Sequence, residues 1–140
     1  MSSKIGLRTK NVSALNINIL VVDDEIFNLE IITELLEDAD YHIDTAENGE
    51  EACNLLRSNP EKYHIVLVDR MMPVKDGMQV VEWMNNDPVL KNIPIIMQTA
   101  KASNSEIQEG LDAGVLYYLT KPFEETVLLS IVDTAVTGSI

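Results

Sequence analysis

The sequence is poor in cysteine, histidine and positive charge, and each shortage narrows the possible functions. Cys53 is the only cysteine in 140 residues, which excludes an internal disulfide and fits a reducing cytoplasm, the predicted location. Two isolated histidines, His42 and His64, provide no cluster of metal ligands. The net charge of −13 argues against direct nucleic-acid binding, because phosphates must be met by lysine and arginine.

Long apolar runs are missing as well. No stretch approaches the ~18 consecutive apolar residues of a membrane helix, and the N-terminal segment lacks the apolar core of a signal peptide. We therefore expect no membrane contact. Residues 1–16 carry Lys4, Arg8 and Lys10 and no acid, which favours a flexible basic leader or linker. Residues 17–138 are expected to form one domain.

Short β-rich runs alternate with amphipathic stretches along this domain. The runs around Val21, Val66 and Ile95 are apolar on both faces, as in the central strands of a parallel sheet. Strict alternation predicts an α/β protein with a doubly wound parallel sheet. Strands are expected at residues 17–22, 41–46, 64–69, 93–100 and 115–119, and helices at 27–38, 49–58, 76–87, 103–114 and 124–136.

Polar side chains gather where the expected strands end. They are Asp23 and Asp24 after the first strand, Asp69 on the third, Thr99 on the fourth and Lys121 after the fifth. Ligands of open α/β sheets bind beyond the carboxyl ends of the strands. Three carboxylates and one ammonium leave a negative charge that a divalent cation would neutralise. Mg²⁺ is favoured, because it binds few carboxylates and takes phosphate oxygens as further ligands.

This set of side chains suits the transfer of a phosphoryl group to a carboxylate. One aspartate can act as the nucleophile, as in enzymes that form aspartyl phosphates. The cation and Lys121 would neutralise charge on the transferring group. The Thr99 hydroxyl can donate a hydrogen bond to one of its oxygens.

Five motifs, in this order and spacing, resemble those of the receiver domains of two-component response regulators. They are VVDDE (21–25), TAENGEEA (45–52), LVDRMMPVKDG (67–77), QTA (98–100) and LTKPF (119–123). The likeness covers about residues 17–137. It implies a flavodoxin-like (βα)5 sheet with the strand order 2-1-3-4-5 found in chemotaxis receivers.

The resemblance also implies a role for each of these residues. Asp69 would accept the phosphoryl group from a histidine kinase or a histidine phosphotransfer protein. Asp24, Asp69 and the backbone carbonyl of Met71 would bind Mg²⁺ directly, and Asp23 would bind it through a water. Lys121 would contact the phosphoryl oxygens. No enzymatic activity is expected beyond the domain's own phosphorylation and dephosphorylation.

Thr99 and Tyr118 would form the switch of such a domain. The Thr99 hydroxyl would move toward the phosphoryl group, and the Tyr118 ring would turn inward behind it. The alternative for Tyr118 is an ordinary aromatic on an edge strand. The signal would reach a face spanning roughly residues 103–137, made of the fourth helix, the fifth strand and the fifth helix. The family pattern also suggests a cis bond before Pro122.

The first helix carries two apolar lines. The expected core stripe is Leu29, Ile32 and Leu36, and the second line is Phe27, Ile31 and Leu35. Receivers similar to this one dock that helix on the helical bundle of the kinase, so Phe27 and Ile31 are predicted to lie in that interface. The alternative is that Leu35 and Ile31 belong to the core.

Two departures from the family pattern concern phosphoryl lifetime and the switch. Met71 lies two positions after Asp69, where members that lose phosphate quickly have polar or acidic side chains. Methionine orients water poorly, which predicts slow self-dephosphorylation. Gln98 replaces a usually apolar neighbour of Thr99 and is expected to lie outside the chemistry.

Three other functions share parts of this pattern. A flavodoxin-type electron carrier would need a loop rich in glycine and hydroxyls where the chain has DDE (23–25). A phosphatase of the haloacid dehalogenase type would need a second aspartate where the chain has Met71. A receiver-like binding module that is never phosphorylated also fits, although the presence of Asp69, Thr99 and Lys121 argues against it.

Overall fold

The computed structural model describes residues 16–138, which contain a five-stranded parallel sheet with the order β2-β1-β3-β4-β5. The predicted flavodoxin-like topology is confirmed. The strands are β1 (Asn18–Val22), β2 (His42–Ala46), β3 (Ile65–Asp69), β4 (Ile95–Thr99) and β5 (Tyr117–Thr120). The predicted leader falls almost entirely on residues 1–15, which lie outside the described residues.

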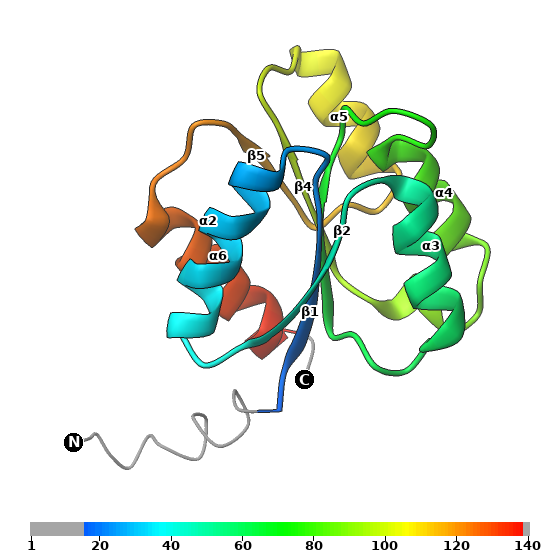
Figure 1. Ribbon diagram of the computed structural model, residues 1–140. Helices are drawn as coiled ribbons and strands as arrows, with labels where there is room; N and C mark the ends of the chain where they lie inside the picture. The colour runs from blue at the N-terminus through cyan, green and yellow to red at the C-terminus, as the bar shows by residue number, and fades with distance from the viewer. Residues whose placement is uncertain (1–15, 139–140) are drawn as a thin grey trace.

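Helices cover both faces of the sheet (Figure 1). Helices α2 and α6 lie on one face, and α3 and α4 lie on the other, with α5 beyond them near the carboxyl ends of the strands. Their bounds are α2 (Ile26–Asp38), α3 (Gly49–Ser58), α4 (Gly77–Asn85), α5 (Asn104–Asp112) and α6 (Glu125–Gly138), with a short 3₁₀ helix, η2 (Leu90–Asn92), before β4. None of the helices within residues 16–138 has the length and apolar character needed to span a bilayer.

The central strands are apolar on both faces because each face has its own core. Val21 of β1 packs with the α2 and α6 side chains, while its neighbour Val22 packs with those of α3 and α4. Every residue of β3 and β4 is buried. Buried aliphatic side chains each stabilise the fold by roughly 1.5–3 kcal/mol, so the central strands form the rigid base beneath the carboxyl edge.

Polar caps fix where helices α3, α4 and α5 begin. Asp76 and Ser103 form capping boxes at the starts of α4 and α5. Asn48 accepts a hydrogen bond from the Glu51 N–H at the start of α3. The last strand begins two residues later than predicted, because the N–H of Val115 donates to Gly110 O and so belongs to the turn that ends α5.

Candidate functional site

The three aspartates at the carboxyl edge of the sheet meet in one cluster. Asp23 and Asp24 follow β1, Asp69 ends β3, and one carboxylate oxygen from each lies within 4.8 Å of the other two. Asp23 and Asp69 are buried, whereas Asp24 is exposed. We call these residues, together with Lys121, the acidic pocket.

The Asp23 carboxylate is surrounded by hydrogen-bond donors. Its Oδ1 accepts from the Glu25 N–H at 2.9 Å. Its Oδ2 accepts from Asn28 Nδ2 at 2.5 Å and from Lys121 Nζ at 3.1 Å. Gln98 Nε2 lies 3.4 Å from the same oxygen. These donors compensate for the burial of a charged group that would otherwise be costly.

Asp69 has fewer donors around its carboxylate. Lys121 Nζ lies 3.5 Å from Asp69 Oδ2, and the Met71 N–H lies 3.4 Å from Oδ1. Burial first, and then the charge of Asp23, raise the pKa of Asp69 to about 6, although Lys121 acts in the opposite direction. A carboxylate held in this way retains unused acceptor capacity in the ligand-free protein.

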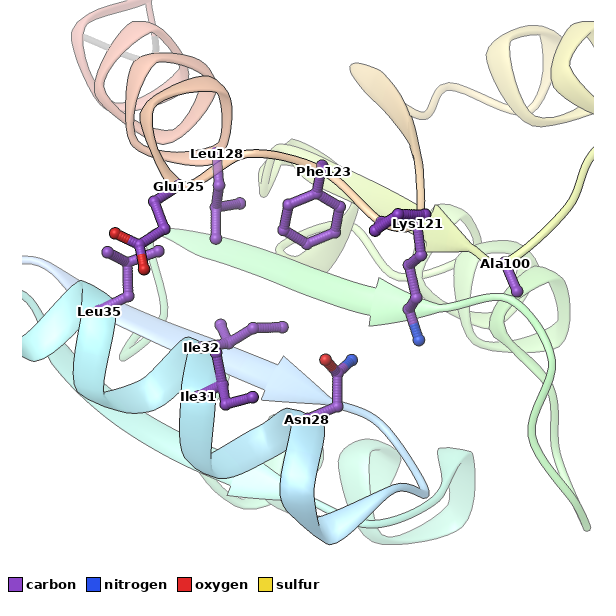
Figure 2. Close-up of a pocket in the computed structure, with 10 residues that line it drawn as sticks. Asn28, Ile31, Ile32, Leu35, Ala100, Lys121, Phe123, Glu125 and Leu128 are labelled. Carbon is purple, nitrogen blue, oxygen red and sulfur yellow. The ribbon is translucent and has the colours of Figure 1, made fainter.

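Lys121 provides a positive charge between the two buried aspartates. Its side chain is 16% exposed and reaches the carboxylates of Asp23 and Asp69, with Glu25 Oε1 at 3.9 Å. The side chain extends from the end of β5 toward Asn28 on α2 (Figure 2). Its backbone N–H donates to Thr99 O at 2.7 Å, and the bond to Pro122 is cis, as the family pattern suggests.

A glycine at the start of α4 fixes the backbone beneath Asp69. A Cβ atom on Gly77 would lie 2.6 Å from the carbonyl oxygen of Asp69, which is closer than side-chain atoms approach backbone. The Gly77 N–H also donates to Arg70 O at 2.9 Å, closing the loop between β3 and α4. Only glycine permits this close approach of the helix to the strand.

The hydroxyls of the two predicted switch residues bind groups other than the Asp69 carboxylate in this structure. Thr99 is buried, and its hydroxyl donates to Lys101 O at 3.2 Å. Tyr118 is half-buried against the core of the α3 and α4 face. Its hydroxyl accepts a hydrogen bond from Arg70 Nη1 at 2.9 Å.

Two neighbours of the pocket were not predicted from the sequence, and the structure places a third residue beside Asp23. Asn28 and Arg70 carried no recognised signal, although Asn28 lies in the first turn of α2, beside the pocket. Gln98, which was expected to lie outside the chemistry, has its Nε2 3.4 Å from Asp23 Oδ2. The reason is the register: Gln98 pairs with Asp69 across β3 and β4, so both side chains emerge on the same face of the sheet.

The donor set of the acidic pocket fits a hard divalent cation. Its ligand atoms are carboxylate oxygens, which Mg²⁺ prefers, and three of them converge. Asp24 is exposed, and Asp69 has unused acceptor capacity, so these two can bind a cation directly. The Asp23 oxygens already accept from Asn28 and Lys121, which favours a contact through water.

The exposed side of α2 presents apolar side chains beside the pocket. Phe27 is 74% exposed and Ile31 is 46% exposed. Leu35 packs against the core, as the alternative for this apolar line predicted. The stripe of Leu29, Ile32 and Leu36 is buried, as predicted. A cavity of about 540 Å³ lies between α2 and the start of α6, and Lys121 lines it at the end nearest the pocket (Figure 2).

Comparison with known proteins gives one consistent result. A family model described as "Response regulator receiver domain" matches residues 19–133. The transcriptional regulatory protein ResD of Bacillus subtilis is 40% identical over 105 residues, which are 75% of this chain and 42% of ResD. The chain spans about half the length of the most similar curated relatives.

Solved structures of the same kind superpose closely. The signal receiver domain of a signal transduction histidine kinase from Syntrophus aciditrophicus has a TM-score of 0.79 and 29% identity, covering 86% of this chain and 90% of that one. The chemotaxis protein CheY4 of Vibrio cholerae also has a TM-score of 0.79, with 30% identity, covering 85% of this chain and 98% of CheY4.

Proposed function

This chain belongs to the family of response regulator receiver domains, and we propose that Asp69 is its phosphoacceptor. Receiver domains are signalling modules of two-component systems. The observation that supports Asp69 is its position as a buried carboxylate 3.5 Å from Lys121 and within the cluster formed with Asp23 and Asp24. We further propose that the domain extends over residues 17–138, with residues 1–16 as a leader or linker.

The donor in this proposal is a phosphohistidine of a histidine kinase or a histidine phosphotransfer protein. An Asp69 carboxylate oxygen attacks phosphorus, the bond from phosphorus to the imidazole nitrogen breaks, and the imidazole takes the electron pair and a proton from solvent. The product is an acyl phosphate on Asp69 and a neutral histidine on the donor. Ionised Asp69 is required, and a pKa near 6 leaves most of it ionised at neutral pH.

The other residues of the pocket would orient and neutralise the transferred group. Mg²⁺, held by Asp24, Asp69 and the Met71 carbonyl and through water by Asp23, would neutralise charge on the phosphoryl oxygens. Lys121, already 3.5 Å from Asp69 Oδ2, would pair with a phosphoryl oxygen. Asn28 would keep Asp23 oriented while Lys121 changes partner.

Transmission of the signal would begin at Thr99 and Tyr118. The Thr99 hydroxyl would leave Lys101 O for a phosphoryl oxygen, and the Tyr118 ring would turn inward. The surface that changes would be formed by α5, β5 and α6. The domain would exchange between a resting and a switched state. A phosphoryl group can shift this equilibrium only to the extent that it interacts more strongly with the switched state than with the resting state.

Mass spectrometry of the intact protein tests the proposal. Incubation with acetyl phosphate and Mg²⁺ should add about 80 Da, the mass of one phosphoryl group. Asp69→Asn should show no gain, while the matched control Asp112→Asn, on the exposed side of α5, should react like the wild type. A wild type without the gain would refute the phosphoacceptor role and leave a binding module that is never phosphorylated.

We propose that the exposed side of α2 receives the phosphoryl donor. Phe27 and Ile31 are exposed apolar side chains next to the acidic pocket, where a docked partner would place its histidine. Phe27→Ala should slow phosphotransfer from the kinase about tenfold at limiting receiver concentration, with an unchanged rate from acetyl phosphate. An equal rate of transfer from the kinase would exclude this docking site.

We also propose that the phosphorylated form is long-lived. Met71 is 67% exposed at the mouth of the pocket and cannot orient an attacking water. Loss of the added mass should therefore take minutes or longer, and Met71→Glu should accelerate it. Decay of the wild type within seconds would contradict the role given to Met71.

A further inference from the structure

Arg70, the residue directly after Asp69, links the end of β3 to both β5 and α5. Its Nη1 donates to the Tyr118 hydroxyl at 2.9 Å and to Glu106 O at 2.9 Å, and its Nη2 binds the Glu109 carboxylate. The guanidinium carbon lies 6.0 Å from the centroid of the Tyr118 ring. We call Arg70, Tyr118, Glu106 and Glu109 the Arg70 cluster.

The backbone of Arg70 is fixed on both sides. Its N–H donates to Gln98 O at 2.8 Å, and its carbonyl accepts from the Gly77 N–H at 2.9 Å. The Arg70 side chain is only 12% exposed. A guanidinium presents its donors in a planar fork, so three acceptors on two elements hold it in one orientation.

The Tyr118 ring is confined between Arg70 and α5. A Cβ atom on Gly110 would lie 2.8 Å from Tyr118 Cε2, so the ring occupies the space that a side chain at position 110 would need. The ring can move away from this place only if its hydroxyl leaves Arg70 Nη1. Such a move would leave a donor of a largely buried guanidinium without its acceptor, which opposes the move.

We propose that Arg70 is a positioning residue that holds Tyr118 in its resting place and thereby opposes the phosphorylation-linked switch. The inference rests on the proposed function, because it takes Tyr118 as the switch residue. A residue that stabilises the resting state must weaken the binding of any ligand that favours the switched state, because the conformational equilibrium and the binding affinity are linked. Loss of Arg70 should therefore strengthen phosphoryl-analogue binding.

Beryllofluoride, formed from beryllium and fluoride salts in the presence of Mg²⁺, is a suitable analogue, and a BeF3-activated receiver domain, DrrB, is among the solved structures similar to this chain. Calorimetric titration should give R70Q about fivefold tighter binding than the wild type. In a Y118F background, which lacks the hydroxyl, R70Q should change the affinity less than about twofold. R57Q, which removes a guanidinium on α3, is the matched control and should bind like the wild type.

A second readout needs neither Mg²⁺ nor analogue. With 3-fluorotyrosine incorporated, the ¹⁹F signal of Tyr118, assigned from Y118F, should shift in ligand-free R70Q and stay unchanged in R57Q. R70K keeps the charge but not the fork, so it should restore only part of the wild-type spectrum. E109Q keeps Arg70 but removes the negative charge that one of its acceptors carries, and it should shift the same signal even if R70Q folds poorly.

The results separate this inference from the function on which it rests. A wild type that binds no beryllofluoride would overturn the proposed function. A wild type that binds it, with R70Q binding equally or more weakly, would overturn the inference alone. An unchanged Tyr118 signal in R70Q and E109Q would also overturn the inference.

Discussion

The acidic pocket and the Arg70 cluster begin at adjacent residues, Asp69 and Arg70, yet they differ in charge balance. In the pocket, three carboxylates lie together, and the single ammonium of Lys121 pairs with two of them, Asp23 and Asp69. In the cluster, one guanidinium meets a hydroxyl, a carbonyl and a carboxylate. The pocket therefore has an excess of negative charge, which favours a cation and, once the cation is bound, a phosphoryl group. In the cluster the charge of the guanidinium is balanced by the Glu109 carboxylate, and the contacts hold Tyr118 in position.

This difference predicts different responses to substitution. Changes in the acidic pocket should alter ligand binding, chemistry and the response to pH. Changes in the Arg70 cluster should alter the position of Tyr118, the stability of the fold and, only through Tyr118, the affinity for a phosphoryl analogue, with little effect on the chemistry at Asp69. Three experiments test this difference between the acidic pocket and the Arg70 cluster.

The largest effect is expected from removing the positive charge of the pocket. Lys121→Met leaves Asp23 and Asp69 without their shared partner and removes the charge that would stabilise the transferring phosphoryl group. The rate of phosphorylation by acetyl phosphate should fall roughly 10²–10³-fold, as when a preorganised donor is removed from an active site. Stopped reactions analysed by intact mass measure this rate. Lys91→Met, on η2, is the control, and a loss below threefold in Lys121→Met would contradict the role of the ammonium.

A smaller effect is expected from the ionisation of Asp69 in the absence of divalent cations. Its pKa is raised from 3.8 to about 6, so the folded state disfavours the charged form, and stability is lost as the pH rises through about 6. Asp69→Asn cannot ionise. It should therefore exceed the wild type in free energy of unfolding by at most about 3 kcal/mol at pH 7.5, and by much less at pH 4.5.

Urea titrations in EDTA at the two pH values measure this difference. Asp112→Asn, at an exposed position outside the acidic pocket, is the matched control. Added Mg²⁺ should narrow the gap at pH 7.5, because a cation that binds the folded wild type stabilises it. An equal difference in free energy of unfolding at both pH values would show that ionisation of Asp69 does not destabilise the folded state.

The smallest effect is expected in the Arg70 cluster. Gly110→Ala places a Cβ atom against the Tyr118 ring and should destabilise the protein by about 1 kcal/mol, after allowing for the better helix propensity of alanine. In a Tyr118→Ala background the same substitution should stabilise by about 1 kcal/mol, because only the propensity gain remains. Urea unfolding of the four proteins gives both values. Destabilisation in both backgrounds would show that the ring is not the obstacle.

The alternation of apolar strands with amphipathic helices was enough to predict a doubly wound α/β sheet, whereas the strand order 2-1-3-4-5 was implied by the resemblance to receiver domains. The runs at 17–22 and 64–69 are apolar at every central position, which only a sheet covered on both faces explains, and β1 and β3 are buried in this way. Boundaries were less certain where a turn continues the hydrogen bonding of a helix, as at Val115.

The acidic pocket could be outlined from sequence because parallel strands bring their carboxyl ends to one edge. Asp23, Asp69 and Lys121 each lie at or just beyond a strand end, so their meeting follows from topology alone. The Arg70 cluster could not be found in this way. Arg70 and Tyr118 are 48 positions apart, and their contact depends on the direction of two long side chains, which no local pattern encodes.

The loop between β3 and α4 is closed at its base and open at its tip. Gly77 and Arg70 join its two ends, while Met71 and Val74 project into solvent, 67% and 84% exposed. The hydrogen bond at the base fixes the backbone next to Asp69, whichever side chains stand at the tip. The side chains at the tip can therefore change during evolution, and with them a partner or the lifetime of the phosphorylated form, while the backbone that positions Asp69 stays the same.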